Sequence, residues 1–196
     1  MWGIICQQPV PLSDTKDAWS WSPTGSGNFT FSSACEIIRP PSAIFQFAEI
    51  IWFPCNSPKM SCCLLRAIHS RLLTRNFLKS IGVCDTDTCV LCQTHSESVQ
   101  HLSLNVPTLN ICGLSLLKLG LSAASVGTLQ EKAILIKNKF KNKTKSTILA
   151  RLSLSATVWH TWKERNSRVF QLQESHKIVV FRRLHEDISV LLRTCN

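Results

Sequence analysis

Tyrosine is missing from this sequence of 196 residues, and so is any pair of adjacent aspartates. Their absence excludes the Tyr-x-Asp-Asp motif of polymerases, and no cluster of carboxylates indicates the magnesium site of a nuclease. The last 84 residues contain only five acidic residues, among them the adjacent Glu186 and Asp187 on an amphipathic pattern. Such a pair is typical of a solvated helix face, so we expect no enzymatic activity.

Long apolar runs are also missing. None reaches the ~20 residues that a transmembrane helix needs, and the N-terminal MWGIICQQPVPL lacks the basic start of a signal peptide. We therefore expect a soluble intracellular protein, in the nucleus or the cytoplasm, with no membrane partner. In those compartments the ten cysteines should be reduced thiols. Cys62 and Cys63 lie in an apolar run and are expected to be small buried residues.

Charge is distributed unevenly along the chain. Residues 1–112 carry seven Lys/Arg and seven Asp/Glu, whereas residues 113–196 carry fifteen and five. The net charge of +10 therefore belongs to the second half. An acidic partner, above all a nucleic acid, is expected to bind there.

Apolar periodicity and capping residues predict a mainly α protein. Alternating residues on either side of SPTGSG, within 17–31, predict an N-terminal β-hairpin. Ser33 and Glu36 fit a capping box for the first helix. Helices are predicted over 33–39, 43–53, 59–73, 74–82, 146–170 and 176–194. The last two are amphipathic and could pack together as a helical hairpin.

A dense group of cysteines and histidines lies in CDTDTCVLCQTHSESVQHLSLNVPTLNIC, residues 84–112. Cys89-Val-Leu-Cys92 has the spacing with which one tight turn presents two thiolates to a metal ion. His101 follows close enough to add an imidazole. A structural zinc ion needs four ligands, so the three candidates leave one position open.

The order of three sequence blocks resembles a known family. DAWSWSPTGSGNFTFSSACEIIRP, EIIWFPCNSPKMSCCLLRAIHSRLLTRNFLKSIGV and CVLCQTHSESVQHL are similar to the zinc-binding domain that follows the reverse transcriptase in plant LINE-type (non-LTR) retrotransposon polyproteins. The resemblance covers about residues 14–112. VWHTWKERNSRVF is similar to the segment that follows that domain. The resemblance implies a retrotransposon origin and zinc as the cofactor.

The family's ligand set resembles C-x2-C, then His, then Cys five residues later. Cys89, Cys92 and His101 match it, whereas the fourth position falls on Val106, which cannot bind metal. Cys112 and Cys84 are the alternatives, and Cys112 is preferred because it follows His101 as the missing ligand does. We nevertheless expect an incomplete site.

Other positions also depart from the family. An aromatic residue is usual where Cys62 stands, Trp at Leu65 and Phe at Ser103. Losses of large core side chains cost about 2–5 kcal/mol each, so the resemblance implies a marginal domain and a degenerate relic of a mobile element. His95 lies between the expected ligands and is expected to be exposed to solvent.

We therefore predict a small helical zinc-binding-type domain with an N-terminal β-hairpin, followed by two amphipathic helices. Its domains would be 14–112, a basic joining region 113–145, and a helical hairpin 146–196. By the resemblance, its partner could be the reverse transcriptase region of the parent element.

Two non-catalytic functions remain open. In IKNKFKNKTK, lysines on every second residue would point to one side of an extended segment and follow a phosphate backbone, with Phe140 available for stacking. These lysines are Lys137, Lys139, Lys141, Lys143 and Lys145. A solvated linker is the alternative reading. The second function is a helical protein–protein interaction module without metal or nucleic acid.

Overall fold

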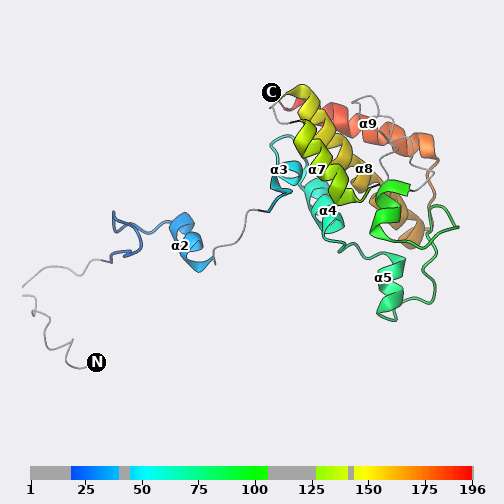
Figure 1. Ribbon diagram of the computed structural model, residues 1–196, viewed down its shortest axis with the longest axis horizontal. Helices are drawn as coiled ribbons and strands as arrows, with labels where there is room; N and C mark the ends of the chain where they lie inside the picture. The colour runs from blue at the N-terminus through cyan, green and yellow to red at the C-terminus, as the bar shows by residue number, and fades with distance from the viewer. Residues whose placement is uncertain (1–18, 40–44, 106–126, 141–143, 196) are drawn as a thin grey trace, which may run out of the picture. The chain divides into compact units, whose positions relative to one another are not determined.

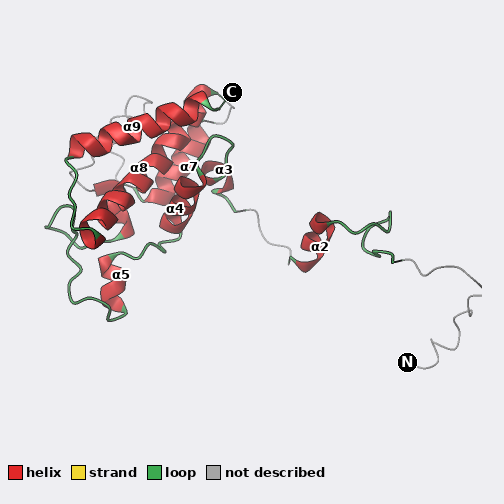
Figure 2. Cartoon of the chain, turned by 180° about the vertical axis from the view of Figure 1, so that it is seen from behind, coloured by secondary structure: helices red, strands yellow, loops and turns green. Residues whose placement is uncertain are grey.

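The computed structural model describes residues 19–39, 45–105, 127–140 and 144–195, which are mainly helical (Figure 2). No β-strand occurs in these ranges; Thr88 and Ser96 form an isolated antiparallel bridge. The chain divides into two compact units, 1–44 and 45–196. The larger unit includes residues from all three segments that the sequence suggests as domains. Within the described residues, no helix is both long and apolar enough to cross a bilayer.

The smaller unit contains one described helix, α2 (Phe31–Ile38). The predicted β-hairpin is not supported in its described part: residues 19–30 contain no strand, and a turn over 22–26 lets the Trp21 N–H donate to the Gly27 carbonyl at 2.7 Å. The apolar side chains Trp19 and Phe29 are exposed there, and a lone hairpin without a buried face is marginal. Helix α2 is predicted correctly. Its capping box, however, begins at Thr30, whose hydroxyl accepts the Ser33 N–H.

Seven helical segments occur in the described part of the larger unit (Figure 1). They are α3 (Ala48–Ile51), α4 (Pro58–Ile68), α5 (Arg75–Ser80), the π-helical turn η1 (His101–Asn105), α7 (Leu129–Lys139), α8 (Lys145–Phe170) and α9 (Lys177–Arg193). The helices predicted over 74–82, 146–170 and 176–194 are confirmed within a few residues. Helix α7 was not predicted.

Two predicted helices are too long. The helix expected over 43–53 is only α3 in the described residues, because the side chains of Asn56 and Ser61 donate to the Ile51 carbonyl at 3.0 and 2.8 Å and satisfy its C-terminal end. Helix α4 stops at Ile68. Ser70 adopts a left-handed φ of 54° there, and the Arg71 N–H donates to the Arg66 carbonyl, as in a Schellman termination.

Helix α8 is the centre of the larger unit. It packs against α3, α4, α7, α9 and η1, and the first half of its length is buried on most sides. One side joins Leu154 and Val158 to the core that α3, α4 and α7 share. Another side places Leu152 against Met60 and the α9 residues Leu184 and Ile188. Helices α8 and α9 thus pack against each other within a larger bundle (Figures 1 and 2).

The cysteines differ from expectation at two places. Cys63 is buried as predicted, whereas Cys62 is exposed on the outer side of α4. Cys55 forms a disulfide with Cys195, with Cα atoms 5.2 Å apart, so the expectation of reduced thiols is wrong for this pair. The bond joins the α3–α4 connection to the residues after α9.

Candidate metal centre

Three of the predicted ligands meet in the structure. The donor atoms of Cys89, Cys92 and His101 all lie within 4.8 Å of one another. Cys89 is fully buried, His101 is 8% exposed, and Cys92 is half-buried. The Cys92 Sγ lies 3.2 Å from the His101 Nε2.

A tight backbone loop presents the two thiols. The Cys89 N–H donates to the His95 carbonyl at 2.8 Å, and the Gln93 N–H donates to the Cys89 carbonyl at 2.9 Å. Gln93 adopts a positive φ of 59°, which lets the chain reverse within this short span. The Leu91 N–H donates to the Cys89 Sγ at 3.4 Å. Backbone N–H groups directed at sulfur favour the thiolate, the form that binds a metal.

The helical turn η1 supplies His101. The His101 N–H is the first of this turn and donates to the Ser98 hydroxyl at 3.0 Å. The Leu102 N–H donates to the Ser98 carbonyl. Ser98 thus caps this turn at its N-terminus. Leu102 is buried with Val90 and Leu91 of the loop and with Val180 of α9. The apolar residues between and beside the ligands therefore fix the loop against the helical bundle.

The two thiols differ in their acidity. Burial raises the pKa of the Cys89 thiol, although the N–H groups of Cys92 and Leu91 oppose this. Burial would also raise the pKa of Cys92, but hydrogen bonds from Thr94 and His95 outweigh it and lower this pKa from 9.0 to about 5. A thiolate at Cys92 is consequently the ordinary state near neutral pH.

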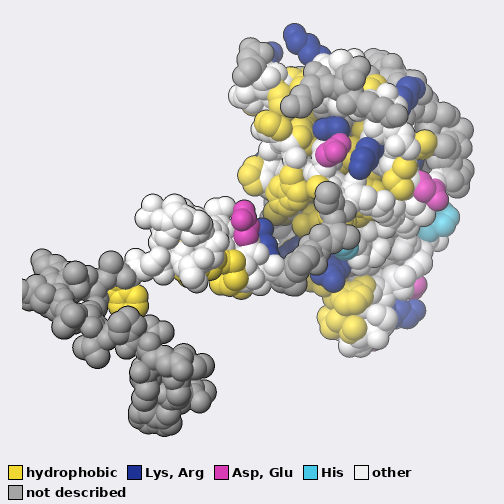
Figure 3. All heavy atoms as spheres, turned by 60° about the vertical axis from the view of Figure 1, so that its left-hand side comes forward, with side chains coloured by type: hydrophobic (Ala, Val, Ile, Leu, Met, Phe, Trp, Pro, Cys, Tyr) yellow, Lys and Arg dark blue, Asp and Glu magenta, His cyan; other side chains and the backbone are white. Residues whose placement is uncertain are grey.

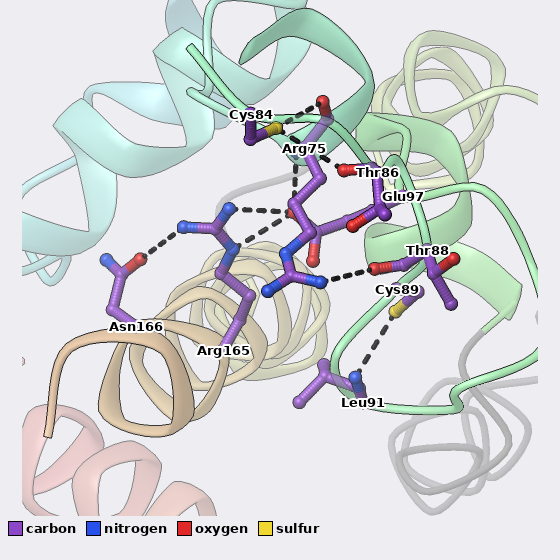
Figure 4. Close-up of polar contacts among 9 residues, drawn as sticks. All are labelled: Arg75, Cys84, Thr86, Thr88, Cys89, Leu91, Glu97, Arg165 and Asn166. Carbon is purple, nitrogen blue, oxygen red and sulfur yellow. Dashed lines mark hydrogen bonds and ion pairs between the residues drawn. The ribbon is translucent and has the colours of Figure 1, made fainter. Parts of the chain in front are cut away.

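Residues 87–97, which include Cys89 and Cys92, are called the metal loop here. A buried ion pair holds this loop to the helical bundle (Figure 4). The Arg165 Nε of α8 donates to the Glu97 Oε1 at 3.0 Å, and the same oxygen accepts the Arg75 N–H at 2.8 Å. Thr74 precedes α5 as predicted, yet its side chain makes no capping bond. Glu97, which is distant in sequence, caps this helix instead, and its carboxylate charge favours the N-terminal end of the helix.

The donor set fits zinc. Ligands of one tetrahedral zinc, with bonds of about 2.0–2.3 Å, lie about 3.6 Å apart. The Cys92 Sγ and His101 Nε2 are 3.2 Å apart, and all three donor atoms lie within 4.8 Å of one another. Two thiolates and an imidazole are ligand types that zinc prefers. In a bound state the ion would tie the loop to η1. Three protein ligands leave one tetrahedral position for a further donor.

The other predicted ligands do not join this group. Cys112 and Val106 lie outside the described residues. The Cys84 thiol donates to the Thr86 carbonyl at 3.3 Å and to the Arg75 carbonyl at 3.6 Å, so it points to backbone and not to the metal group. The alternative with Cys84 as a ligand is not supported by this geometry.

The predicted lysine strip is not extended where the structure describes it. Lys137 and Lys139 belong to helix α7. Residues two positions apart on an α-helix point in directions about 200° apart, so these two lysines cannot share one side. The Lys137 Nζ donates to the Gln46 carbonyl at 3.0 Å. Lys145 begins α8, and Lys141 and Lys143 lie outside the described residues. Phe140 packs against the main core and is not free to stack on a base.

His95 is exposed, as predicted, and its ring is stacked on that of His101, with centroids 5.4 Å apart at an interplanar angle of 28°. One important residue, Glu97, was missed from the sequence. Glu97 gave no local signal, because its partner Arg165 is 68 residues away.

Comparison with known proteins supports the metal centre. Residues 29–111 match the family model described as zinc-binding in reverse transcriptase. No curated protein and no solved structure matches the chain. The matched segment includes Cys89, Cys92 and His101, and it ends before α7, α8 and α9. Residues 29–111 are therefore similar to the zinc-binding domain of reverse transcriptases.

Proposed function

We propose that this chain is a non-catalytic zinc-binding module derived from a retrotransposon of the plant LINE type, in which it would serve a reverse transcriptase as a nucleic-acid-binding accessory. The observation that carries the proposal is the convergence of the Cys89, Cys92 and His101 donor atoms within 4.8 Å. The match of residues 29–111 to the reverse transcriptase zinc-binding model supports the same reading.

A structural role for the metal follows from the surroundings of the ligands. Catalytic zinc sites keep one position open to water and substrate, whereas structural sites are closed. Here Cys89 is fully buried, and its neighbours Val90 and Leu91 are packed against α9. Zinc would hold the loop and η1 against the bundle and so stabilise the fold around the Glu97–Arg165 pair.

Nucleic-acid binding is supported by charge. The second half of the chain carries the whole net charge of +10, and Lys139 and Lys145 are exposed on α7 and α8. Figure 3 shows Lys and Arg side chains spread over one face of the molecule, with acidic and apolar groups between them. A net positive charge favours contacts with phosphates without reading base sequence.

The proposed relic has kept a formed core despite its departures from the family. Cys62 is exposed, so a smaller side chain there leaves no cavity. Leu65 is half-buried against the main core, and Ser103 is buried in η1. Only these two positions carry the expected cost of a lost large side chain.

A protein–protein interaction module is the second candidate, and exposed apolar residues favour it. Phe170, Leu172 and Ile178 are 75, 89 and 61% exposed around the connection between α8 and α9. Phe170 also lines a cavity of about 340 Å³ beside this connection. Large exposed apolar side chains near one connection favour an interface there.

Zinc content tests the primary proposal. The purified full chain should contain one zinc ion per molecule by elemental mass spectrometry, and Cys89→Ser, Cys92→Ser and His101→Ala should each lose it. Cys62→Ser is the matched control, because this exposed thiol lies outside the group and should leave the zinc content unchanged. A parent chain without zinc after exposure to excess Zn²⁺ would overturn the proposal.

A further inference from the structure

The imidazole of His95 lies beside the candidate metal group. Its Nδ1 is 3.9 Å from the Cys92 Sγ, and its ring is stacked on that of His101 at an interplanar angle of 28°. Two ligands of one tetrahedral zinc lie about 3.6 Å apart. The 3.9 Å spacing is therefore close to that of two ligands sharing an ion.

The backbone fixes His95 next to the cysteines. Its carbonyl accepts the Cys89 N–H at 2.8 Å, and the adjacent Ser96 forms the antiparallel bridge with Thr88. Cys89 and His95 thus face each other across the same closed loop.

We propose that His95 is the fourth zinc ligand and replaces the cysteine that the family has at position 106. The ligand set is then Cys89, Cys92, His95 and His101, a Cys2His2 site contained within one loop and one helical turn. This inference rests on the proposed zinc binding. It needs no donor from residues 106–126.

Ligation requires a rotation of the His95 side chain. This residue is not among the three whose donor atoms all lie within 4.8 Å of one another, and its Nδ1 is 2.8 Å from the Thr94 Oγ1. The side chain is exposed to solvent, and the described contacts that the rotation would alter are the stacking on His101 and the hydrogen bond to Thr94. A bond to zinc would replace the hydrogen bond to Thr94.

Three other donors could occupy the fourth position: Cys84, a water molecule and Cys112. The Cys84 thiol is engaged with backbone carbonyls. A water molecule could occupy the fourth position, but the site would then bind zinc with lower affinity than a site with four protein ligands. Cys112 would contribute a third sulfur, and this difference in ligand composition makes the alternatives separable.

X-ray absorption of the zinc-loaded full chain provides the test, with cobalt(II) spectra as a second readout. We expect two sulfur and two nitrogen ligands and a tetrahedral cobalt spectrum. His95→Ala should weaken zinc binding by about 100-fold or more, since loss of an outer-shell partner alone costs 10–100-fold. His185→Ala is the matched control: His185 is also exposed and contacts an aromatic ring, that of Phe181, at 4.4 Å.

The outcomes separate this inference from the zinc proposal. If the parent chain binds no zinc, the proposed function fails. If it binds zinc through Cys89, Cys92 and His101 while His95→Ala has unchanged affinity and cobalt spectrum, only the His95 assignment fails. Three sulfurs, reduced to two in Cys112→Ser, would assign the fourth position to Cys112. Two sulfurs and a single imidazole, in a spectrum unaffected by His95→Ala, would assign it to water.

Discussion

Arg165 and Glu97 form a buried ion pair that joins helix α8 to the metal loop. The Arg165 Nε donates to the Glu97 Oε1 at 3.0 Å, and the Nη2 lies 2.8 Å from the same oxygen. Their side chains are 2% and 0% exposed. The guanidinium also lies over the Trp162 ring, 4.9 Å from its centroid. This pair connects α5, the metal loop and the central helix α8 (Figure 4).

Glu97→Gln should lower the free energy of unfolding by about 3–5 kcal/mol, because it leaves the Arg165 charge buried without a counter-ion. Urea unfolding of the zinc-free protein measures this effect. Adding Arg165→Met to Glu97→Gln should recover part of the loss, since no uncompensated charge remains.

The matched control is the exposed pair of Arg182 and Glu186 on α9, whose charged groups are 3.9 Å apart. Arg182→Met should change stability by no more than about 0.5 kcal/mol, as is usual for solvent-exposed pairs. A cost below about 1 kcal/mol for Glu97→Gln would contradict a buried, energetically important pair.

Zinc should stabilise the folded chain. At a free concentration about 1,000 times the dissociation constant, a ligand that binds only the folded state adds about 4 kcal/mol. Thermal unfolding with and without a chelator should show this as a drop in melting temperature. Cys92→Ser should unfold at the same temperature in both conditions, whereas Cys62→Ser should respond as the parent does.

Stability should fall as the pH drops below about 6.5. Burial lowers the pKa of His160 in the folded protein, and the nearby charges of Lys163 and Lys59 lower it further. Asp187 opposes this lowering, since its Oδ2 lies 3.1 Å from the His160 Nε2. Below the ordinary histidine pKa the unfolded chain therefore binds a proton that the folded chain does not. The loss continues down to the folded pKa, at up to about 1.4 kcal/mol per pH unit.

Removal of the imidazole should flatten this dependence. His160→Gln should show a smaller decrease in unfolding free energy between about pH 6.5 and 5 than the zinc-free parent, because the other titrating groups are common to both proteins. An identical slope in the two proteins would exclude His160 as its source.

The neighbouring cysteines of α4 should react very differently. Burial raises the pKa of Cys63 to about 12, so at pH 8 only roughly one molecule in ten thousand carries its thiolate. Cys62 is exposed. Mass spectrometry after brief alkylation should find the label on Cys62, and on Cys63 only after unfolding. Equal labelling of both residues in the folded protein would contradict the buried position of Cys63.

Nucleic-acid binding, if it depends on the basic segment, should weaken with salt. Replacing Lys137, Lys139, Lys141, Lys143 and Lys145 with Gln should lower the affinity for a single-stranded RNA at low salt. It should also reduce the salt slope by about 0.7 for each phosphate that the variant no longer neutralises. Lys79→Gln is the control, because Lys79 is paired with Asp87 at 3.2 Å in the neutral half of the chain.

An unchanged affinity in the five-lysine variant would exclude this segment as the binding site. Partner binding that is insensitive to salt and is abolished in Phe170→Ser would instead support the protein–protein interaction module.

Helices α8 and α9 could be predicted from sequence because their signals are local. Apolar residues recur at helical spacing, and caps depend on residues within about four positions. Helix α7 carries the same kind of signal: Thr128 and Glu131 form a capping box, and Leu129, Ala133 and Ile136 lie on one buried side. The alternating lysines that overlap its C-terminal end favour an extended segment instead, and this competing pattern hides the helix.

The sequence by itself determined the helical class, the amphipathic helix α8 and three candidate metal-binding residues, because C-x2-C presents Cys89 and Cys92 within one turn and His101 follows close behind. Only the tertiary structure brought Arg165 to Glu97, 68 residues away in the chain. It also showed which of Cys62 and Cys63 is buried and which helix Glu97 caps. These relationships depend on how α8 packs against segments far away in the chain, and no local spacing encodes that packing.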